Sequence, residues 1–276
     1  MPDEQFDGDS AFGYVEQQMA FGPRIPGSEG HELTRDMIME TLQSHGWDAK
    51  IQTGEYRGEP ILNIIGSRKR DTFADHMQHI VIGAHYDTRI FADRSADSDD
   101  RSRPVPGAND GASGVAVLLE LSRVLPEYDN LLVQLVFFDA EDDGYINDWD
   151  WILGSRHFAE NLEYEPDAVV IVDMIGDKQQ EIYMEKSSDS TLRGEIWAVA
   201  AGLGIDTFIQ EEKYQILDDH TPFLQLGIPA VDLIDFDYPY WHTTEDTLDK
   251  VSASSLENVG LVLQDWLRYR DSLGNK

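Results

Sequence analysis

The sequence contains no cysteine, so no disulfide can staple the fold and no thiol can act as a nucleophile or a metal ligand. It also has no apolar run close to the ~20 residues that a membrane-spanning helix needs. The first residues, MPDEQFDGDS, are acidic and polar rather than a basic, apolar leader. We therefore expect a soluble protein, exported if a leader has been removed and cytoplasmic otherwise.

Basic residues are scarce as well. The chain has 21 Lys and Arg against 53 Asp and Glu, which gives a formal net charge of -32 at pH 7. This imbalance argues against nucleic acid or an anionic membrane as a partner, and it fits a heavily hydrated surface or cationic ligands. Carboxylate clusters arise by chance in such a chain. Histidine, with only 8 copies, is the better indicator of a functional site.

Apolar runs alternate with helical patterns along the chain. Within each run the apolar residues are continuous, which is typical of strands that helices cover on both faces. We predict one domain over residues 1–276, in which residues 1–20 form a peripheral N-terminal segment. The fold class is α/β with three layers, a mostly parallel central sheet and helices on both faces. The predicted strands are 61–65, 79–85, 131–140, 168–174 and 230–235.

Three helices are marked by their spacing of apolar residues. The first covers residues 31–46, with Leu33 at the start of its apolar stripe, and the second covers residues 111–125. The last helix begins near Ser254, which has capping-box spacing to Glu257.

Residues 91–109 are polar and contain proline and glycine, which predicts a surface loop. Arginines beside and within this loop are expected to neutralise neighbouring acids and to have no catalytic role. These are Arg89, Arg94, Arg101 and Arg103.

Histidines and acids follow the predicted strands where they end. His85 and Asp87 are two apart, so both leave the same face of their strand, and Glu141 and Asp142 follow the next one. Ligands of open α/β sheets gather at this edge. Further polar or aromatic residues at strand or loop ends are Asp110, Asp173, Asp218, Asp219, His220, Asp232, Trp241 and His242.

Each of these residues also has a simpler explanation. Asp110 could cap the helix that follows it. His85 could be a buried histidine with a satisfied hydrogen bond, and Glu141 and Asp142 could lie in a solvated loop. The convergence of five strand or loop ends favours a metal site instead. Nitrogen and oxygen ligands without cysteine suit one zinc ion or two, and a dication would compensate the four carboxylates in FFDAEDDG, residues 137–144.

Seven ordered motifs resemble the zinc exopeptidase superfamily, which holds di-zinc aminopeptidases and glutaminyl cyclases. The resemblance runs from about residue 20 to the C-terminus. The motifs are GAHYDTR, PGANDGASGVAVLLELSRVL, FFDAED, GSRHFA, DMIG, DDHTPFLQLGIPAVDLID and YWHTTEDTLDKVS.

The resemblance implies metal positions and a branch of the superfamily. The Glu141–Asp142 pair and Trp241 before His242 resemble the bacterial glutaminyl cyclases rather than the aminopeptidases. Animal cyclases carry a histidine where this chain has Asp232, whose role is left open. The implied metal positions are His85, Asp110, Asp142, Asp173 and His242.

The expected function is therefore glutaminyl-peptide cyclotransfer, in which an N-terminal Gln of a peptide or protein closes to pyroglutamate and releases ammonia. One zinc is expected, held by Asp110, Asp142 and His242, with Glu141 moving the proton. If two zinc ions bind, His85 and Asp173 complete the second site. The remaining expected site residues are Asp173 and Asp218, which hold the moving groups, Trp241 as an apolar wall, and Trp149 and Trp151 at the pocket mouth.

Two alternatives stay open. The first is a di-zinc aminopeptidase that hydrolyses N-terminal residues, with Glu141 activating a water. The second is a non-catalytic metal-binding module on the same fold. Such modules typically lose the acid/base carboxylate or a ligand, whereas this chain keeps Glu141 and every ligand position.

Overall fold

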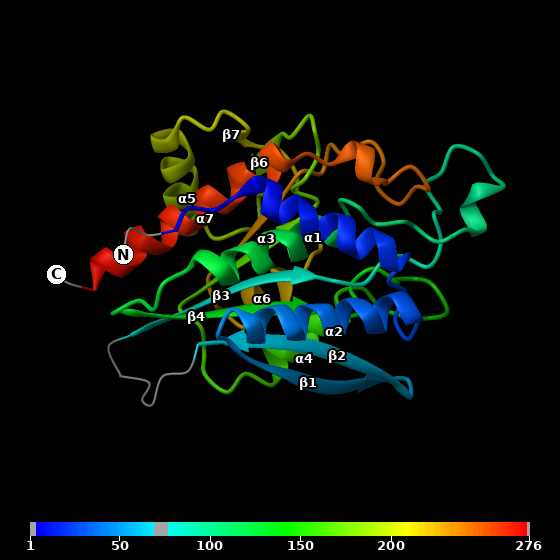
Figure 1. Ribbon diagram of the computed structural model, residues 1–276, viewed down its shortest axis with the longest axis horizontal. Coiled ribbons are helices and arrows are strands. Elements are labelled where there is room, and N and C mark those ends of the chain that lie inside the picture. Colours follow the sequence, from blue (N-terminus) through cyan, green and yellow to red (C-terminus); the bar gives the residue numbers. More distant parts are fainter. Residues whose placement is uncertain (1–3, 69–76, 275–276) are drawn as a thin grey trace.

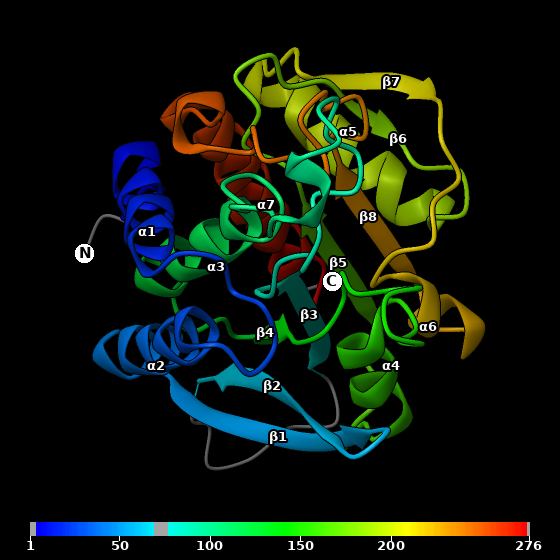
Figure 2. The ribbon, with the colours of Figure 1, turned by 90° about the vertical axis from the view of Figure 1, so that its right-hand side faces the viewer.

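A six-stranded sheet runs through the centre of the protein (Figures 1 and 2). The computed structural model describes residues 4–68 and 77–274. All five predicted strands are present, and the pairs β4–β3, β3–β5 and β5–β8 are parallel, which confirms the mostly parallel sheet. In spatial order the strands are β1 (Asp48–Tyr56), β2 (Glu59–Ser67), β4 (Leu131–Phe138), β3 (Gln78–His85), β5 (Ala168–Asp173) and β8 (Ala230–Ile234).

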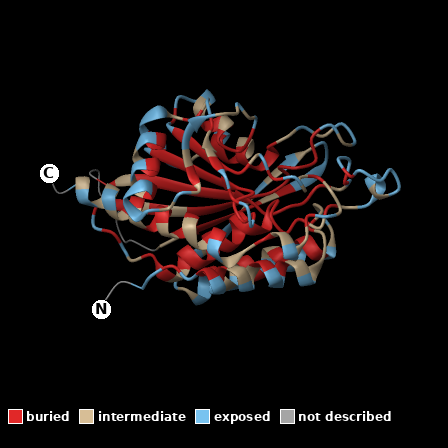
Figure 3. Ribbon diagram, turned by 90° about the horizontal axis from the view of Figure 1, so that it is seen from above, coloured by how far each residue is buried: buried red, intermediate tan, exposed pale blue. Residues whose placement is uncertain are grey.

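Helices cover both faces of this sheet, as the continuous apolar runs predict. Successive residues of β3 show why: Ile80 and Ile82 belong to the core on one face, and Val81 belongs to the core on the other. Figure 3 shows the central strands buried and the helices exposed mainly on their outer sides. One face carries α1 (Gly8–Phe21), α2 (Glu29–Ser44), α3 (Ala112–Val124), α5 (Ser190–Leu203) and α7 (Ala253–Leu273); the other carries α4 (Leu153–Glu160) and α6 (Thr221–Gln225).

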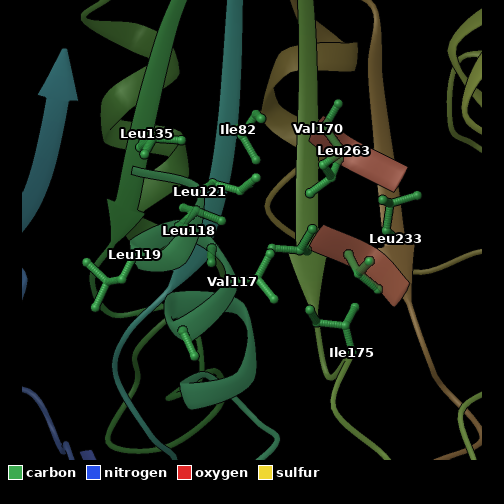
Figure 4. Close-up of a cluster of buried hydrophobic side chains, with 14 of the residues drawn as sticks. Ile82, Val117, Leu118, Leu119, Leu121, Leu135, Val170, Ile175, Leu233 and Leu263 are labelled. Atoms are coloured by element: carbon green, nitrogen blue, oxygen red, sulfur yellow. The ribbon is translucent and has the colours of Figure 1, made fainter. Parts of the chain in front are cut away.

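The larger core lies between the sheet and helices α3 and α7. In Figure 4, Leu118 and Leu121 of α3 and Leu263 of α7 lie against the apolar face of the parallel strands. Each is fully buried, and burying a side chain of this size stabilises the fold by roughly 1.5–3 kcal/mol. This packing fixes the strands whose carboxyl ends carry the polar residues described below.

Two helix predictions need correction. Leu33 is exposed to 41%, because α2 turns His31, Thr34 and Ile38 toward the core instead. The last helix begins at Ala253, and its cap is Ser252, whose side chain accepts the backbone N–H of Ser255; Ser254 therefore lies inside the helix.

The segment predicted to be peripheral, residues 1–20, contains most of α1. This helix packs against α3 and α7 and buries Ala11 and Val15, so it belongs to the helical layer. No helix among residues 4–68 and 77–274 is long and apolar enough to cross a membrane.

The loop 91–109 reaches the surface only in part. Its middle, with the short 3-10 helix η1 (Asp100–Ser102), is largely exposed, whereas Val105 and Ala108 are buried. In Figure 1 this loop projects beside the segment that precedes η2 (Leu248–Lys250). Hydrogen bonds join these segments, among them one from Arg94 N to His242 O and one from Thr244 N to Ser95 Oγ. A small parallel pair, β6 (Ile182–Met184) and β7 (Phe208–Glu212), completes the fold.

Candidate active site and metal centre

A cavity of about 260 Å³ opens at the carboxyl ends of the parallel strands. Parallel strands end at one edge of a sheet, so the residues that follow β4 and β5 meet there. A larger hollow of about 380 Å³ lies against β1 and α4 and shares none of the residues that line this cavity. The predicted site residues that line the cavity are Asp110, Glu141, Asp142, Trp151, Asp173, Asp218, Trp241 and His242.

Two groups of potential metal ligands meet at this edge. In the first, Nε2 of His242 lies 2.8 Å from Oδ1 of Asp142 and 3.7 Å from Oδ2 of Asp110. In the second, Nε2 of His85 lies 3.2 Å from Oδ1 of Asp110 and 3.2 Å from Oδ1 of Asp173. Within each group the ligand atoms lie within 4.8 Å of one another. Asp110 belongs to both groups, so the arrangement provides two adjacent positions of three potential ligands each.

The chemistry of these residues fits a zinc ion. Oδ2 of Asp110 and Oδ2 of Asp142 are buried and have no hydrogen-bond partner among the described residues. Burial, and then the charges of neighbouring acids such as Asp218, raises the pKa of Asp173 to about 7, against a pull downward from His85. Burial alone would lower the pKa of His242, but the charge of Asp142 raises it to about 9. Three buried carboxylates that converge beside two histidines are a site for a dication with nitrogen and oxygen ligands.

The four carboxylates of FFDAEDDG separate into different roles. Asp139 lies 2.8 Å from Nε2 of His31 and also accepts the N–H of Leu62, so it joins α2 to β2. Asp143 accepts the N–H of Ile90. Only Glu141 and Asp142 reach the cavity. The solvated-loop explanation is wrong, because Glu141 is 9% and Asp142 1% exposed.

Glu141 is held in place through its backbone. The N–H groups of Glu141 and Asp142 donate to the two carboxylate oxygens of Asp87, each at 3.1 Å. The preceding Ala140 adopts the left-handed conformation with φ 54°. Burial, and then the negative charge of Asp142, raises the pKa of Glu141 well above its ordinary value. A carboxylate with a raised pKa can both accept and return a proton near neutral pH.

Asp110 does not cap α3. The N-cap position is Gly111, with φ 89°, and a Cβ at this position would come within 2.8 Å of the carbonyl oxygen of Asp87. The backbone N–H of Asp110 donates to Asp246, which in turn accepts the hydroxyl of Tyr238. The Asp110 side chain is thereby left to face His85 and His242.

His85 is buried, as a core histidine would be, but its neighbours are acids. Nδ1 lies 3.5 Å from Asp87, and Nε2 faces Asp110 and Asp173. Together these carboxylates raise the pKa of His85 well above its ordinary value, although burial opposes the shift.

The remaining predicted acids divide between the cavity and the interior behind it. Asp218 lines the cavity, whereas Asp232 is fully buried behind it and does not. Burial, and then the charge of Asp218, raises the pKa of Asp232 well above its ordinary value. His220, with Nδ1 3.7 Å from Asp232, turns its Nε2 toward Ser187, 3.1 Å away and outside the cavity.

Two tryptophans enclose His242. The Trp241 ring lies 4.0 Å from the His242 ring, and Trp151 is nearly parallel to it at 6.0 Å. His242 itself has φ 56°. Trp149 was predicted at the pocket mouth, but it packs edge-on against Tyr56 and lines a different hollow. The turn formed by residues 143–152 thus directs Trp149 away from the cavity and Trp151 toward it.

Sequence reasoning missed a clamp formed by Arg89 and Asp93. Arg89 is buried, donates to the carbonyl of Asp142 at 2.6 Å and to Asp93 at 2.7 Å, and lies over the ring of Trp151. The other oxygen of Asp93 lies 3.7 Å from Nδ1 of His242. Arg94, the next residue, covers the ring of Trp241 at 4.8 Å. The only sequence signal for the clamp is the spacing of four between Arg89 and Asp93.

Asp93→Asn is expected to weaken zinc binding by about 10- to 100-fold, the usual cost of losing a carboxylate that orients a ligand histidine. Chelator competition would measure the zinc affinity. The matched control is Asp99→Asn, which makes the same charge change at an exposed position of the same loop. Equal zinc affinities in the two variants would show that Asp93 does not orient His242.

The chain is similar in sequence and structure to proteins of one known family. The model of peptidase family M28 matches residues 63–267. A solved structure of glutaminyl cyclase from Porphyromonas gingivalis is 33% identical, with a TM-score of 0.89, covering 97% of this chain and 99% of that one. A structure described as a leucine aminopeptidase precursor from Bacteroides thetaiotaomicron is 32% identical, with a TM-score of 0.88, covering 95% and 97%. The glutaminyl-peptide cyclotransferase of Bos taurus is 27% identical over 286 residues, which span 87% of this chain and 76% of the relative.

Proposed function

Because the chain belongs to peptidase family M28, we propose that it is a zinc-dependent glutaminyl-peptide cyclotransferase. Its substrates are peptides or proteins with an N-terminal glutamine. The α-amine attacks the side-chain carboxamide carbon, a carbon–nitrogen bond forms to close the ring, the bond to the amide nitrogen breaks, and ammonia leaves. The observation that carries this proposal is the convergence of Asp110, Asp142 and His242 beside Glu141, while Asp173 is paired with His85.

Asp110, Asp142 and His242 would hold the zinc ion, and one ion per chain is the expected content. Bound there, zinc supplies Lewis acidity that favours charge developing on the carboxamide oxygen. The three protein ligands leave a coordination position for substrate, which is the usual composition of a catalytic zinc site.

Glu141 would carry out the proton transfer. Its carboxylate takes a proton from the attacking amine and returns it to the departing nitrogen, so that the residue ends the cycle unchanged. Because the amine and the carboxamide belong to one residue, the protein gains proximity without having to position a water. Asp173 and Asp218, which line the same cavity, would accept hydrogen bonds from the moving N–H groups.

Trp241 would form the apolar wall against which the methylenes of the glutamine side chain pack. It lies beside Phe236, at a ring distance of 5.1 Å, and both line the cavity. An aromatic wall of this kind restricts the orientation of the substrate without offering a competing charge.

The second candidate function is a di-zinc aminopeptidase. The specific observation in its favour is the group formed by His85, Asp110 and Asp173, which could hold a second ion. In that case Glu141 would take a proton from the attacking water, and Asp173 would be a ligand. The similarity to the structure described as a leucine aminopeptidase precursor keeps this alternative open.

A paired peptide assay separates these functions. We expect a peptide that begins with glutamine to lose one ammonia and keep its chain length, and a peptide that begins with leucine to stay intact. Mass spectrometry and an ammonia assay would follow both, with zinc measured per chain on the same preparation. Freed leucine with two zinc ions per chain would support the peptidase. Turnover of neither peptide would favour a non-catalytic module.

A further inference from the structure

The mouth of the active-site cavity lies at one short segment, residues 215–217. Most residues that line the cavity are buried or half-buried. Gln215 and Leu217 are exposed, and Leu217 exposes 49% of its surface. This segment therefore offers a path by which a peptide whose first residue occupies the cavity can leave it.

A second hollow begins on the far side of the same segment. Gln215, Ile216 and Leu217 line both spaces, so they form a ridge between the two. The second hollow continues to Ser187 and to the outer face of α6. The residues that α6 contributes are Thr221, Leu224 and Gln225.

This hollow is uncharged within a strongly acidic protein. None of the residues that line it among the described parts of the chain is charged, although the chain has 53 Asp and Glu. Ile216, Leu217 and Leu224 supply apolar surface, and serine, threonine and glutamine side chains form the remainder. Such a surface binds apolar groups by removing them from water and offers no counter-ion to a charged one.

We propose that the hollow next to the ridge binds the residues that follow the N-terminal glutamine, and that it selects uncharged, apolar side chains at these positions. This inference rests on the proposed function, since it requires the glutamine to occupy the cavity. An extended peptide advances roughly 3.3–3.6 Å per residue, so a chain that crosses the ridge reaches α6 within a few residues. The hollow thereby defines the preferred substrates as peptides with apolar residues after the glutamine.

The test compares three substrates: glutamine amide, Gln-Leu-Leu amide and Gln-Ser-Ser amide. For the unmodified protein, kcat/KM is expected to favour the leucine peptide over the serine peptide by about 3- to 10-fold, somewhat less than an enclosed apolar pocket provides. The difference should lie mainly in KM, because the contact is made equally in the ground and transition states. Glutamine amide reports on the cavity alone.

Leu217→Ser and Leu224→Ser are expected to bring the leucine-to-serine ratio close to one. Because Leu217 also lines the cavity, each ratio is compared with the rate on glutamine amide for the same variant. The matched control is Leu226→Ser, the same change at a leucine that exposes 56% of its surface and lines neither space. Thermal melting would show that each variant folds.

The outcomes separate the two levels of the proposal. If glutamine amide is cyclised and the unmodified protein shows no preference between the peptides, the subsite is overturned and the function stands. A control variant that loses the preference as fully as Leu217→Ser and Leu224→Ser do would overturn the subsite as well. If none of the three substrates is cyclised, the proposed function itself has failed.

Discussion

Glu141→Gln is expected to lower kcat for cyclisation by about 10²- to 10⁴-fold, the range that a positioned general acid–base supplies. The amide has nearly the same shape as the carboxylate but cannot accept a proton from the attacking amine. Its position would be preserved, since the two hydrogen bonds to Asp87 come from the backbone of residues 141 and 142. Steady-state kinetics with a glutamine-initiated peptide would measure the loss.

Zinc content provides the internal control for this variant. Glu141 belongs to neither group of potential metal ligands, so the purified variant should keep the zinc stoichiometry of the unmodified protein. Glu245→Gln makes the same chemical change at an exposed position close to His242 in sequence and should leave kcat unaltered. Full activity in Glu141→Gln would rule out the proposed mechanism for both the cyclase and the peptidase.

His242→Ala is expected to remove zinc and turnover together. The change deletes the only nitrogen among the potential ligands of this group and leaves two buried carboxylates, Asp110 and Asp142. The loss in zinc affinity should exceed the roughly 100-fold upper range seen for outer residues such as Asp93. Chelator competition would measure the affinity, and peptide cyclisation would be followed on the same samples.

The control is His157→Ala, at a half-buried histidine of α4 that lies outside the cavity. Retention of zinc by His242→Ala would show that the metal is bound elsewhere. His85→Ala adds a second readout: a fall from two zinc ions to one would assign His85 to a second ion, and an unchanged count of one would support the single-ion arrangement.

The sequence predicts where the candidate ligands lie because neighbouring parallel strands end at the same edge of a sheet. Once the runs at 79–85, 131–140 and 168–174 are recognised as neighbouring strands, His85, Asp142 and Asp173 must lie at one edge. The pattern of apolar residues is strong in these strands because both faces are covered. Strand β1 was missed for the opposite reason, since it lies at the edge of the sheet and most of its residues are exposed or half-exposed.

The residues that support the ligands are harder to predict. Asp93 lies in a polar loop rich in acids, and only its spacing of four from Arg89 distinguishes it from Asp97 or Asp99. Its partner His242 is distant in the sequence and is brought close only by the packing of two irregular segments. The different positions of Trp149 and Trp151 likewise depend on a turn with several left-handed residues, for which neither helical nor strand periodicity holds.

The left-handed backbone beside the cavity determines which segments unfold locally first. Ala140, Met174 and His242, each next to or within the site, adopt a conformation that costs a non-glycine residue about 1–3 kcal/mol. The surrounding fold imposes these angles, so the segments that carry them should be released before the parallel strands separate. Amide hydrogen exchange in the zinc-free protein should then be faster at these segments than in β3 and β5, and zinc should slow it there first.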